Sequence, residues 1–156
     1  MALPFVERVA MPRAGTPDGG RDAEAPNTRP DRGNAARVLV VEDDFLIAMQ
    51  TEAALVAAGF HVIGTAATAE QAIALAEKER PAIAVMDIRL ASKRDGIDAA
   101  RELYHELNIR CIFATAHDDE TTRTRAAPYA PLGWLAKPYT SASLVALVTA
   151  AVGERE

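Results

Sequence analysis

The sequence has little of several residue types on which whole classes of protein depend. Its 156 residues include one cysteine, Cys111, which excludes an internal disulfide framework and a thiolate zinc cluster. No apolar run is long enough to span a membrane. Positive charge is outnumbered, because 17 Lys and Arg stand against 22 Asp and Glu and give a formal net charge of -5, whereas a nucleic-acid partner needs a basic face. We therefore expect neither a membrane protein nor a nucleic-acid-binding protein.

The first residues do not have the pattern of a secretory leader. Prolines and charged side chains interrupt them at Pro4, Glu7, Arg8 and Pro12, so no apolar signal core can form. The expected compartment is therefore the cytoplasm.

Residues 1–36 differ in composition from the rest of the chain. They contain five of the nine prolines and four of the nine glycines, with almost no large apolar residue after Met11. Such a segment cannot bury enough apolar surface to offset its ordering entropy. We expect a disordered tail over 1–36, followed by one domain over 37–153. The piece LPFVERVAM within the tail is compatible with either a docking peptide or plain tail.

From Arg37 onward, short apolar runs alternate with segments of helical periodicity. The runs predict five strands, at residues 37–41, 61–65, 82–86, 110–114 and 132–136, and the continuous run RVLVV at 37–41 is typical of a strand buried on both faces. Apolar residues at helical spacing mark three of the helices: Leu46, Met49, Ala53 and Val56; Ile97, Ala100, Tyr104 and Leu107; and Leu144, Leu147, Val148 and Ala151.

Helix start and stop signals agree with this order of elements. Gly59 predicts the end of the first helix, and TAEQ at 68–71 is a capping box that opens the second. Thr140 or Ser141 is the expected cap of the last helix. A short helix over 119–127 is weakened by Pro128 and Pro131, which make the approach to the fifth strand irregular.

Five strands alternating with five helices specify a parallel sheet with helices on both faces. For this chain length, the flavodoxin-like strand order 2-1-3-4-5 fits best. In that order the carboxyl ends of the strands share one crevice. The predicted strands end in EDD at 42–44, in Asp87, in Thr115 and in Lys137. We expect these carboxylates, a hydroxyl and an ammonium to converge at one edge of the sheet.

This convergence suits phosphoryl chemistry. Crowded carboxylates without a histidine or thiolate nearby favour a hard cation such as Mg²⁺. An aspartate beside Mg²⁺ can attack phosphorus and form an aspartyl phosphate. A lysine would neutralise the added charge, and a threonine hydroxyl could bond to a phosphoryl oxygen. Asp87 is therefore placed to accept a phosphoryl group.

The segments VLVVEDD, VMDIRL, FATAH and WLAKPY occur in the order, and on the elements, of one known family. From about residue 37 to 152, the chain resembles the receiver domain of two-component response regulators. The resemblance implies that Asp87 is the phosphoacceptor. It also implies that Asp43 binds Mg²⁺ directly, Glu42 through water, and Arg89 through its backbone carbonyl.

The resemblance assigns the remaining site residues to signal output. Thr115 would be the switch hydroxyl, and Lys137, which precedes the family's proline at Pro138, would pair with the phosphate. Trp134 occupies the position of the switch aromatic residue.

The sequence departs from the family pattern in two places. Ala91 stands where a proline is frequent, and the loop DIRLASKRDGID is one residue longer than usual before Gly96. FAT followed by KPY is similar to an alphaproteobacterial FATG…KPF/Y subgroup that is associated with general stress signalling, but Ala116 replaces the glycine of that signature.

Several site residues also have a purely structural interpretation. Asp43 or Asp44 could cap the first helix, Thr115 could cap a strand end, and Trp134 could be core. His105 lies on a helix among glutamates and is expected to be a surface residue, not a phosphotransfer histidine.

The resemblance predicts a single-domain response regulator that takes a phosphoryl group from a histidine kinase or a phosphotransfer protein. It would signal through a downstream protein target, as a monomer or a phosphorylation-dependent dimer. Its only catalysis would be Mg²⁺-dependent phosphorylation and dephosphorylation of itself. Three alternatives are a phosphate sink, a degenerate adaptor and a haloacid-dehalogenase-type phosphatase. The intact site residues argue against a degenerate adaptor. That last enzyme needs an aspartate where Arg89 stands.

Overall fold

A computed structural model describes residues 35–155 of the chain. The tail predicted over 1–36 lies almost wholly outside the described residues and stays a prediction. Five strands form one sheet: β1 (Arg37–Val41), β2 (His61–Ala66), β3 (Ile83–Asp87), β4 (Arg110–Thr115) and β5 (Gly133–Ala136). All neighbouring pairs are parallel, and the order β2-β1-β3-β4-β5 is the predicted one. The predicted fold class is confirmed.

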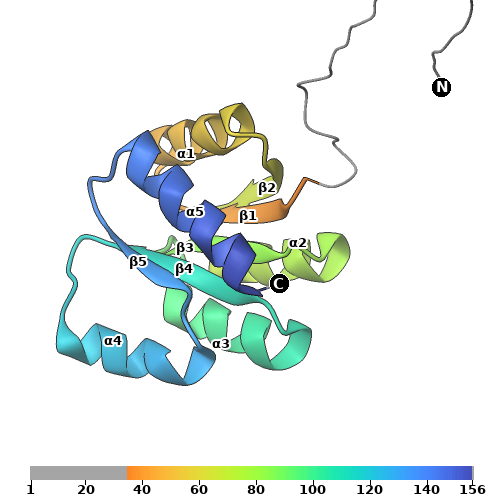
Figure 1. Cartoon of the computed structure of the whole chain (residues 1–156). Coiled ribbons are helices and arrows are strands. Elements are labelled where there is room, and N and C mark those ends of the chain that lie inside the picture. Colours follow the sequence, from red (N-terminus) through yellow and green to blue (C-terminus); the bar gives the residue numbers. More distant parts are fainter. Residues whose placement is uncertain (1–34, 156) are drawn as a thin grey trace, which may run out of the picture. The chain divides into compact units, whose positions relative to one another are not determined.

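Helices cover both faces of this sheet (Figure 1). They are α1 (Phe45–Ala57), α2 (Ala69–Glu79), α3 (Gly96–Leu107), the short α4 (Glu120–Ala126) and α5 (Ser141–Arg155), with a 3-10 turn, η3, at Ala127–Tyr129. The described helices include none that is both long and apolar enough to cross a membrane.

The sheet separates two apolar clusters, because successive side chains of a strand point to opposite faces. Leu39 and Val41 of β1 pack in the cluster with α2 and α3, which Ala126 of α4 also joins. Val38 and Val40 of the same strand pack in the cluster with α1 and α5. The continuous apolar runs in the sequence are therefore explained by burial on both faces.

The buried face of α1 is not the one that the sequence pattern suggested. Leu46, Met49 and Val56 are 62%, 49% and 55% exposed, and Phe45 at the start of the helix is 75% exposed. The buried residues of α1 are Ala48, Thr51 and Leu55. Glu52 is the one charged residue in this helix, so spacing alone cannot identify the side that packs on the sheet.

The helix caps follow the sequence signals, with two differences. Thr140 is the cap of α5, because its hydroxyl accepts from the Ser143 amide at 3.0 Å. The box at TAEQ is half formed: Thr68 accepts from the Gln71 amide, but the Gln71 side chain accepts from the Ala67 amide. A complete capping box, which the sequence reasoning missed, joins Asp95 and Asp98 at the start of α3.

The region predicted as a helix over 119–127 is an α-helix of seven residues that continues into η3. Asp119 caps α4 by accepting from the Thr122 amide at 2.8 Å. Pro128 lies in the 3-10 turn, where its missing N–H cannot extend the α-helical hydrogen bonds. This part of the domain is therefore short and irregular, as the two prolines indicated.

Candidate phosphoacceptor site

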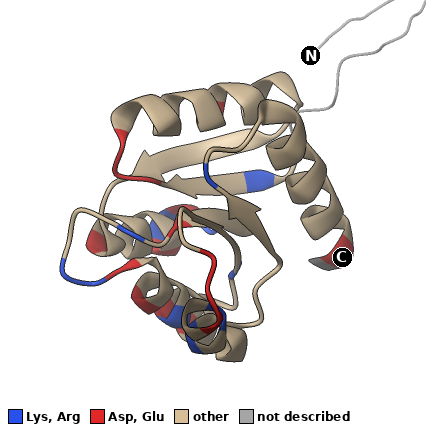
Figure 2. Ribbon diagram, turned by 90° about the vertical axis from the view of Figure 1, so that its left-hand side faces the viewer, with Lys and Arg blue, Asp and Glu red and all other residues tan. Residues whose placement is uncertain are grey.

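The residues expected at the strand ends line one pocket of about 590 Å³. Glu42 follows β1, Asp87 ends β3, Thr115 ends β4 and Lys137 follows β5. Their convergence follows from the parallel order, which places all strand ends at one edge of the sheet. Figure 2 shows the acidic turn between β1 and α1 at this edge. Arg89 also lines the pocket, whereas Trp134 does not.

Three carboxylates in this pocket form a set that could hold a metal ion. One oxygen each from Glu42, Asp43 and Asp87 lies within 4.8 Å of the others. Asp44 is the cap of α1, since its side chain accepts from the Leu46 and Ile47 amides at 3.0 and 3.1 Å. Capping by Asp44 leaves the exposed Asp43 carboxylate available to a ligand at the pocket.

Lys137 bridges the two buried carboxylates. Its Nζ donates to Glu42 Oε1 at 3.0 Å and lies 3.4 Å from Asp87 Oδ1. Burial, together with the nearby Glu42 carboxylate, raises the pKa of Asp87 to about 7, even though the Lys137 ammonium opposes the shift. One ammonium therefore does not compensate three carboxylates. The all-oxygen donor set and this excess of negative charge fit a hard divalent cation.

Thr115 forms its hydrogen bonds within its own loop. Its hydroxyl donates to the His117 carbonyl and accepts from the His117 amide, both at 3.0 Å. In this conformation it caps the end of β4, which is the structural interpretation considered from sequence. Its role as a switch stays a prediction.

Trp134 lies on β5, partly buried, and does not line the pocket. Its ring stacks on Phe113 with centroids 5.1 Å apart and planes at 29°. The guanidinium carbon of Arg123 lies 4.7 Å from the Trp134 ring centre. Arg123 could not be selected from the sequence, because a contact between α4 and β5 depends on tertiary packing.

Gly96 is the residue at which α3 approaches the end of β3. Its amide donates to the Ile88 carbonyl at 2.7 Å. A Cβ atom at this position would lie 2.0 Å from the Asp87 carbonyl oxygen. Only glycine allows this close approach of two backbones.

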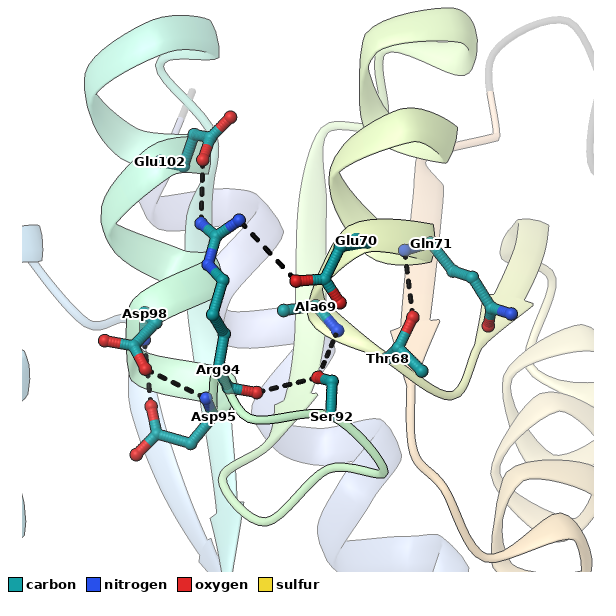
Figure 3. Close-up of polar contacts among 9 residues, drawn as sticks. All are labelled: Thr68, Ala69, Glu70, Gln71, Ser92, Arg94, Asp95, Asp98 and Glu102. Atoms are coloured by element: carbon teal, nitrogen blue, oxygen red, sulfur yellow. Dashed lines mark hydrogen bonds and ion pairs between the residues drawn. The ribbon is translucent and has the colours of Figure 1, made fainter.

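The longer loop between β3 and Gly96 is fixed to α2 and α3 (Figure 3). The Ser92 hydroxyl accepts from the Ala69 amide at 3.2 Å and donates to the Arg94 carbonyl at 2.8 Å. The Arg94 guanidinium pairs with Glu102 at 2.8 Å and with Glu70 at 3.8 Å. These contacts hold the loop to α2 and α3 although the loop contains no proline.

Comparison with known proteins agrees with this architecture. The sequence model of the response regulator receiver domain matches residues 38–149. The chain belongs to the response regulator receiver family. Receiver domains are signalling domains, phosphorylation on an aspartate is general among them, and they generally bind Mg²⁺ through an acidic pocket.

Two curated relatives illustrate the similarity. The transcriptional regulatory protein PdtaR of Mycobacterium tuberculosis is 32% identical over 127 residues, which is 81% of this chain and 62% of PdtaR. The phyllosphere-induced regulator PhyR of Methylorubrum extorquens is 36% identical over 119 residues, which is 76% of this chain and 44% of PhyR. The chain thus spans between 44% and 62% of the lengths of these relatives.

Solved structures show the same fold. The receiver domain of a modulated diguanylate cyclase from Desulfovibrio desulfuricans G20 has a TM-score of 0.73 at 34% identity, and the match covers 78% of this chain and 97% of that one. PhyR from Brucella abortus has a TM-score of 0.66 at 33% identity, with 78% and 49% covered.

Proposed function

We propose that this protein accepts a phosphoryl group on Asp87 from a histidine kinase or a histidine phosphotransfer protein, and signals through protein contacts that depend on this phosphorylation. The observation that carries the proposal is the placement of Asp87 between two carboxylates able to share a metal ion and the Lys137 ammonium. A link to general stress signalling stays a prediction.

The chain's own groups account for the transfer step. An Asp87 carboxylate oxygen attacks phosphorus, the bond from phosphorus to the donor imidazole nitrogen breaks, and that nitrogen keeps the electron pair. Lys137, already 3.4 Å from Asp87, would pair with the phosphoryl oxygens. Glu42, Asp43 and Asp87 would hold Mg²⁺, which when bound supplies charge neutralisation for the transferred group.

Transfer of radiolabelled phosphate from a phosphohistidine protein tests this function. We expect label to enter the wild-type protein only with Mg²⁺ present and to be released by hydroxylamine, which cleaves acyl phosphates. Label that resists hydroxylamine, or no incorporation from either a protein donor or phosphoramidate, would contradict the proposal.

Mg²⁺ should bind weakly before phosphorylation, and Asp43 should contribute to it directly. Asp43→Asn and Asp44→Asn each remove one negative charge from adjacent residues, and asparagine preserves the cap at position 44. We expect the Asp43 variant to lose about tenfold in Mg²⁺ affinity and the Asp44 variant to lose much less, because only Asp43 belongs to the carboxylate set. Titration of the fluorescence of the single tryptophan with Mg²⁺ measures the affinity of each variant. Equal Mg²⁺ affinities in the two variants would refute the role of Asp43.

The exposed face of α1 is the surface on which we expect the phosphodonor protein to dock. All four large apolar side chains that are exposed within residues 35–154 lie on this helix: Phe45, Leu46, Met49 and Val56. The helix begins directly after the acidic turn that lines the pocket, so we expect a protein that delivers a phosphoryl group to Asp87 to contact the start of this helix, at Phe45 and Leu46. Buried apolar contacts there would supply affinity without adding charge near the site.

Two phosphodonors, a phosphohistidine protein and the small molecule phosphoramidate, distinguish docking on α1 from the chemistry at Asp87. Leu46→Gln should slow transfer from a phosphohistidine protein about fivefold or more, and should leave phosphorylation by phosphoramidate unchanged. Val56→Gln is the matched control, because it makes the same kind of change about 15 Å further along the helix. Equal losses with both donors for Leu46→Gln would indicate a defect in chemistry and would contradict docking on α1.

A further inference from the structure

Arg123 on α4 connects the loop after Thr115 to the ring of Trp134. Its Nε and Nη2 donate to the Asp118 carboxylate at 2.6 and 2.7 Å, a bidentate pair. The same guanidinium lies over Trp134, 4.7 Å from the ring centre. Asp118, Arg123 and Trp134, named the Arg123 clamp below, therefore join the β4–α4 loop, α4 and β5.

Thr115 is attached to this clamp through one residue. Its hydroxyl bonds to both backbone groups of His117, and Asp118 follows directly. A hydroxyl has one proton to donate. If Thr115 donates to a phosphoryl oxygen on Asp87, it can no longer donate to the His117 carbonyl, so the peptide that positions Asp118 is released.

A second arginine, Arg125, attaches α4 to the start of α3, independently of the Arg123 clamp. Arg125 Nη1 donates to Asp95 Oδ2 at 2.8 Å, and Nη2 lies 3.7 Å from Asp98 at the start of α3. Asp95 and Asp98 form the capping box of α3, and among the described residues no hydrogen bond or ion pair links them to Thr115, Asp118 or Arg123. Arg125 can therefore keep α4 attached to α3 while the contact between Arg123 and Trp134 opens.

We propose that the Arg123 clamp holds the resting arrangement of β4, α4 and β5, and that phosphorylation opens it through Thr115 and His117. This inference rests on the proposed function of Asp87. The clamp is half exposed to solvent, with 49% of the Arg123 and 38% of the Asp118 side chain accessible. Exposed ion pairs and cation–π contacts are weak, so losing one would shift the ratio of resting to open protein by about two- to fivefold. A contact of that size can be overcome by one new charge-assisted hydrogen bond.

Beryllofluoride, which mimics the phosphoryl group, provides the test. Because the clamp stabilises the resting state, Asp118→Asn and Arg123→Gln should each bind beryllofluoride about two- to fivefold more tightly than the wild type, measured by fluorine NMR with Mg²⁺ present. Asp118→Asn is the more specific variant, because the side chain that lies over the Trp134 ring is that of Arg123 and stays unchanged. The double variant should bind no more tightly than either single variant, because both break the same contact. Arg125→Gln is the matched control and should bind like the wild type.

Tryptophan fluorescence gives the second readout. In the wild type, beryllofluoride should change the Trp134 emission, and Asp118→Asn without beryllofluoride should already show part of that change. Unchanged affinity in both Asp118→Asn and Arg123→Gln, with normal binding by the wild type, would overturn the clamp alone. No binding of beryllofluoride by the wild type would instead overturn the proposed function of the site.

Discussion

Asp87→Asn is expected to reduce phosphorylation by more than about a hundredfold, because the amide removes the nucleophile while it keeps the shape of the side chain. The same substitution should raise the Tm of the protein in EDTA. Burial and the Glu42 carboxylate both disfavour a charge on Asp87, so an uncharged group there relieves repulsion. Loss of activity together with a gain in thermal stability would distinguish a functional carboxylate from a structural one.

The measurement is intact-mass analysis after incubation with phosphoramidate and Mg²⁺, with a thermal melt of each variant. Asp44→Asn is the control, since it removes a neighbouring carboxylate that caps α1 and lies outside the metal-binding set. Hydroxylamine-sensitive phosphate retained at the wild-type level in Asp87→Asn would show that another residue accepts the phosphoryl group.

Gly96→Ala is expected to be the most destabilising single-methyl change at this site. The added Cβ would lie 2.0 Å from the Asp87 carbonyl oxygen and 2.9 Å from its carbon, and a backbone segment held in the sheet on both sides cannot yield as a flexible side chain can. Overpacking of this kind costs about 1–3 kcal/mol or more. That corresponds to a fall in Tm of at least about 4 °C. Phosphorylation should fall too, since relief of the clash displaces Asp87.

Gly153→Ala is the matched control for this substitution. Gly153 is a helical glycine in α5, and a Cβ there meets nothing within 4 Å. Alanine should therefore stabilise the helix by about 0.5–1 kcal/mol. If both variants melt at or above the wild-type temperature, the close contact between Gly96 and Asp87 does not constrain the fold.

The strands and their order could be predicted from the sequence because the apolar runs are strongly patterned. A segment such as RVLVV, buried on both faces, is hard to place anywhere but inside a parallel sheet. Once the order was fixed, topology alone brought the residues after β1, β3, β4 and β5 to one edge. The convergence of Glu42, Asp87, Thr115 and Lys137 needed no side-chain geometry.

What the sequence could not specify depends on tertiary contacts. The buried side of α1 is ambiguous because apolar residues occur all around that helix, and Thr51 is buried through a hydrogen bond to Tyr139 that lies 88 residues away. Lys137 is nearer to Glu42 than to Asp87, a detail set by packing. The contact between Arg123 and Trp134 joins α4 and β5, and no pattern in the sequence of either element predicts that they meet.

Asp87 ends a strand, β3, that is buried at all five residues and paired on both sides, with β1 and β4. Its backbone can open to solvent only when most of the domain unfolds, which takes seconds or longer in stable domains. Residues 117–125, by contrast, are exposed or half-buried and can open locally in microseconds to milliseconds. The backbone of Asp87 and the segment 117–125 are therefore expected to move on different timescales, so the segment can rearrange while the backbone of Asp87 stays in place.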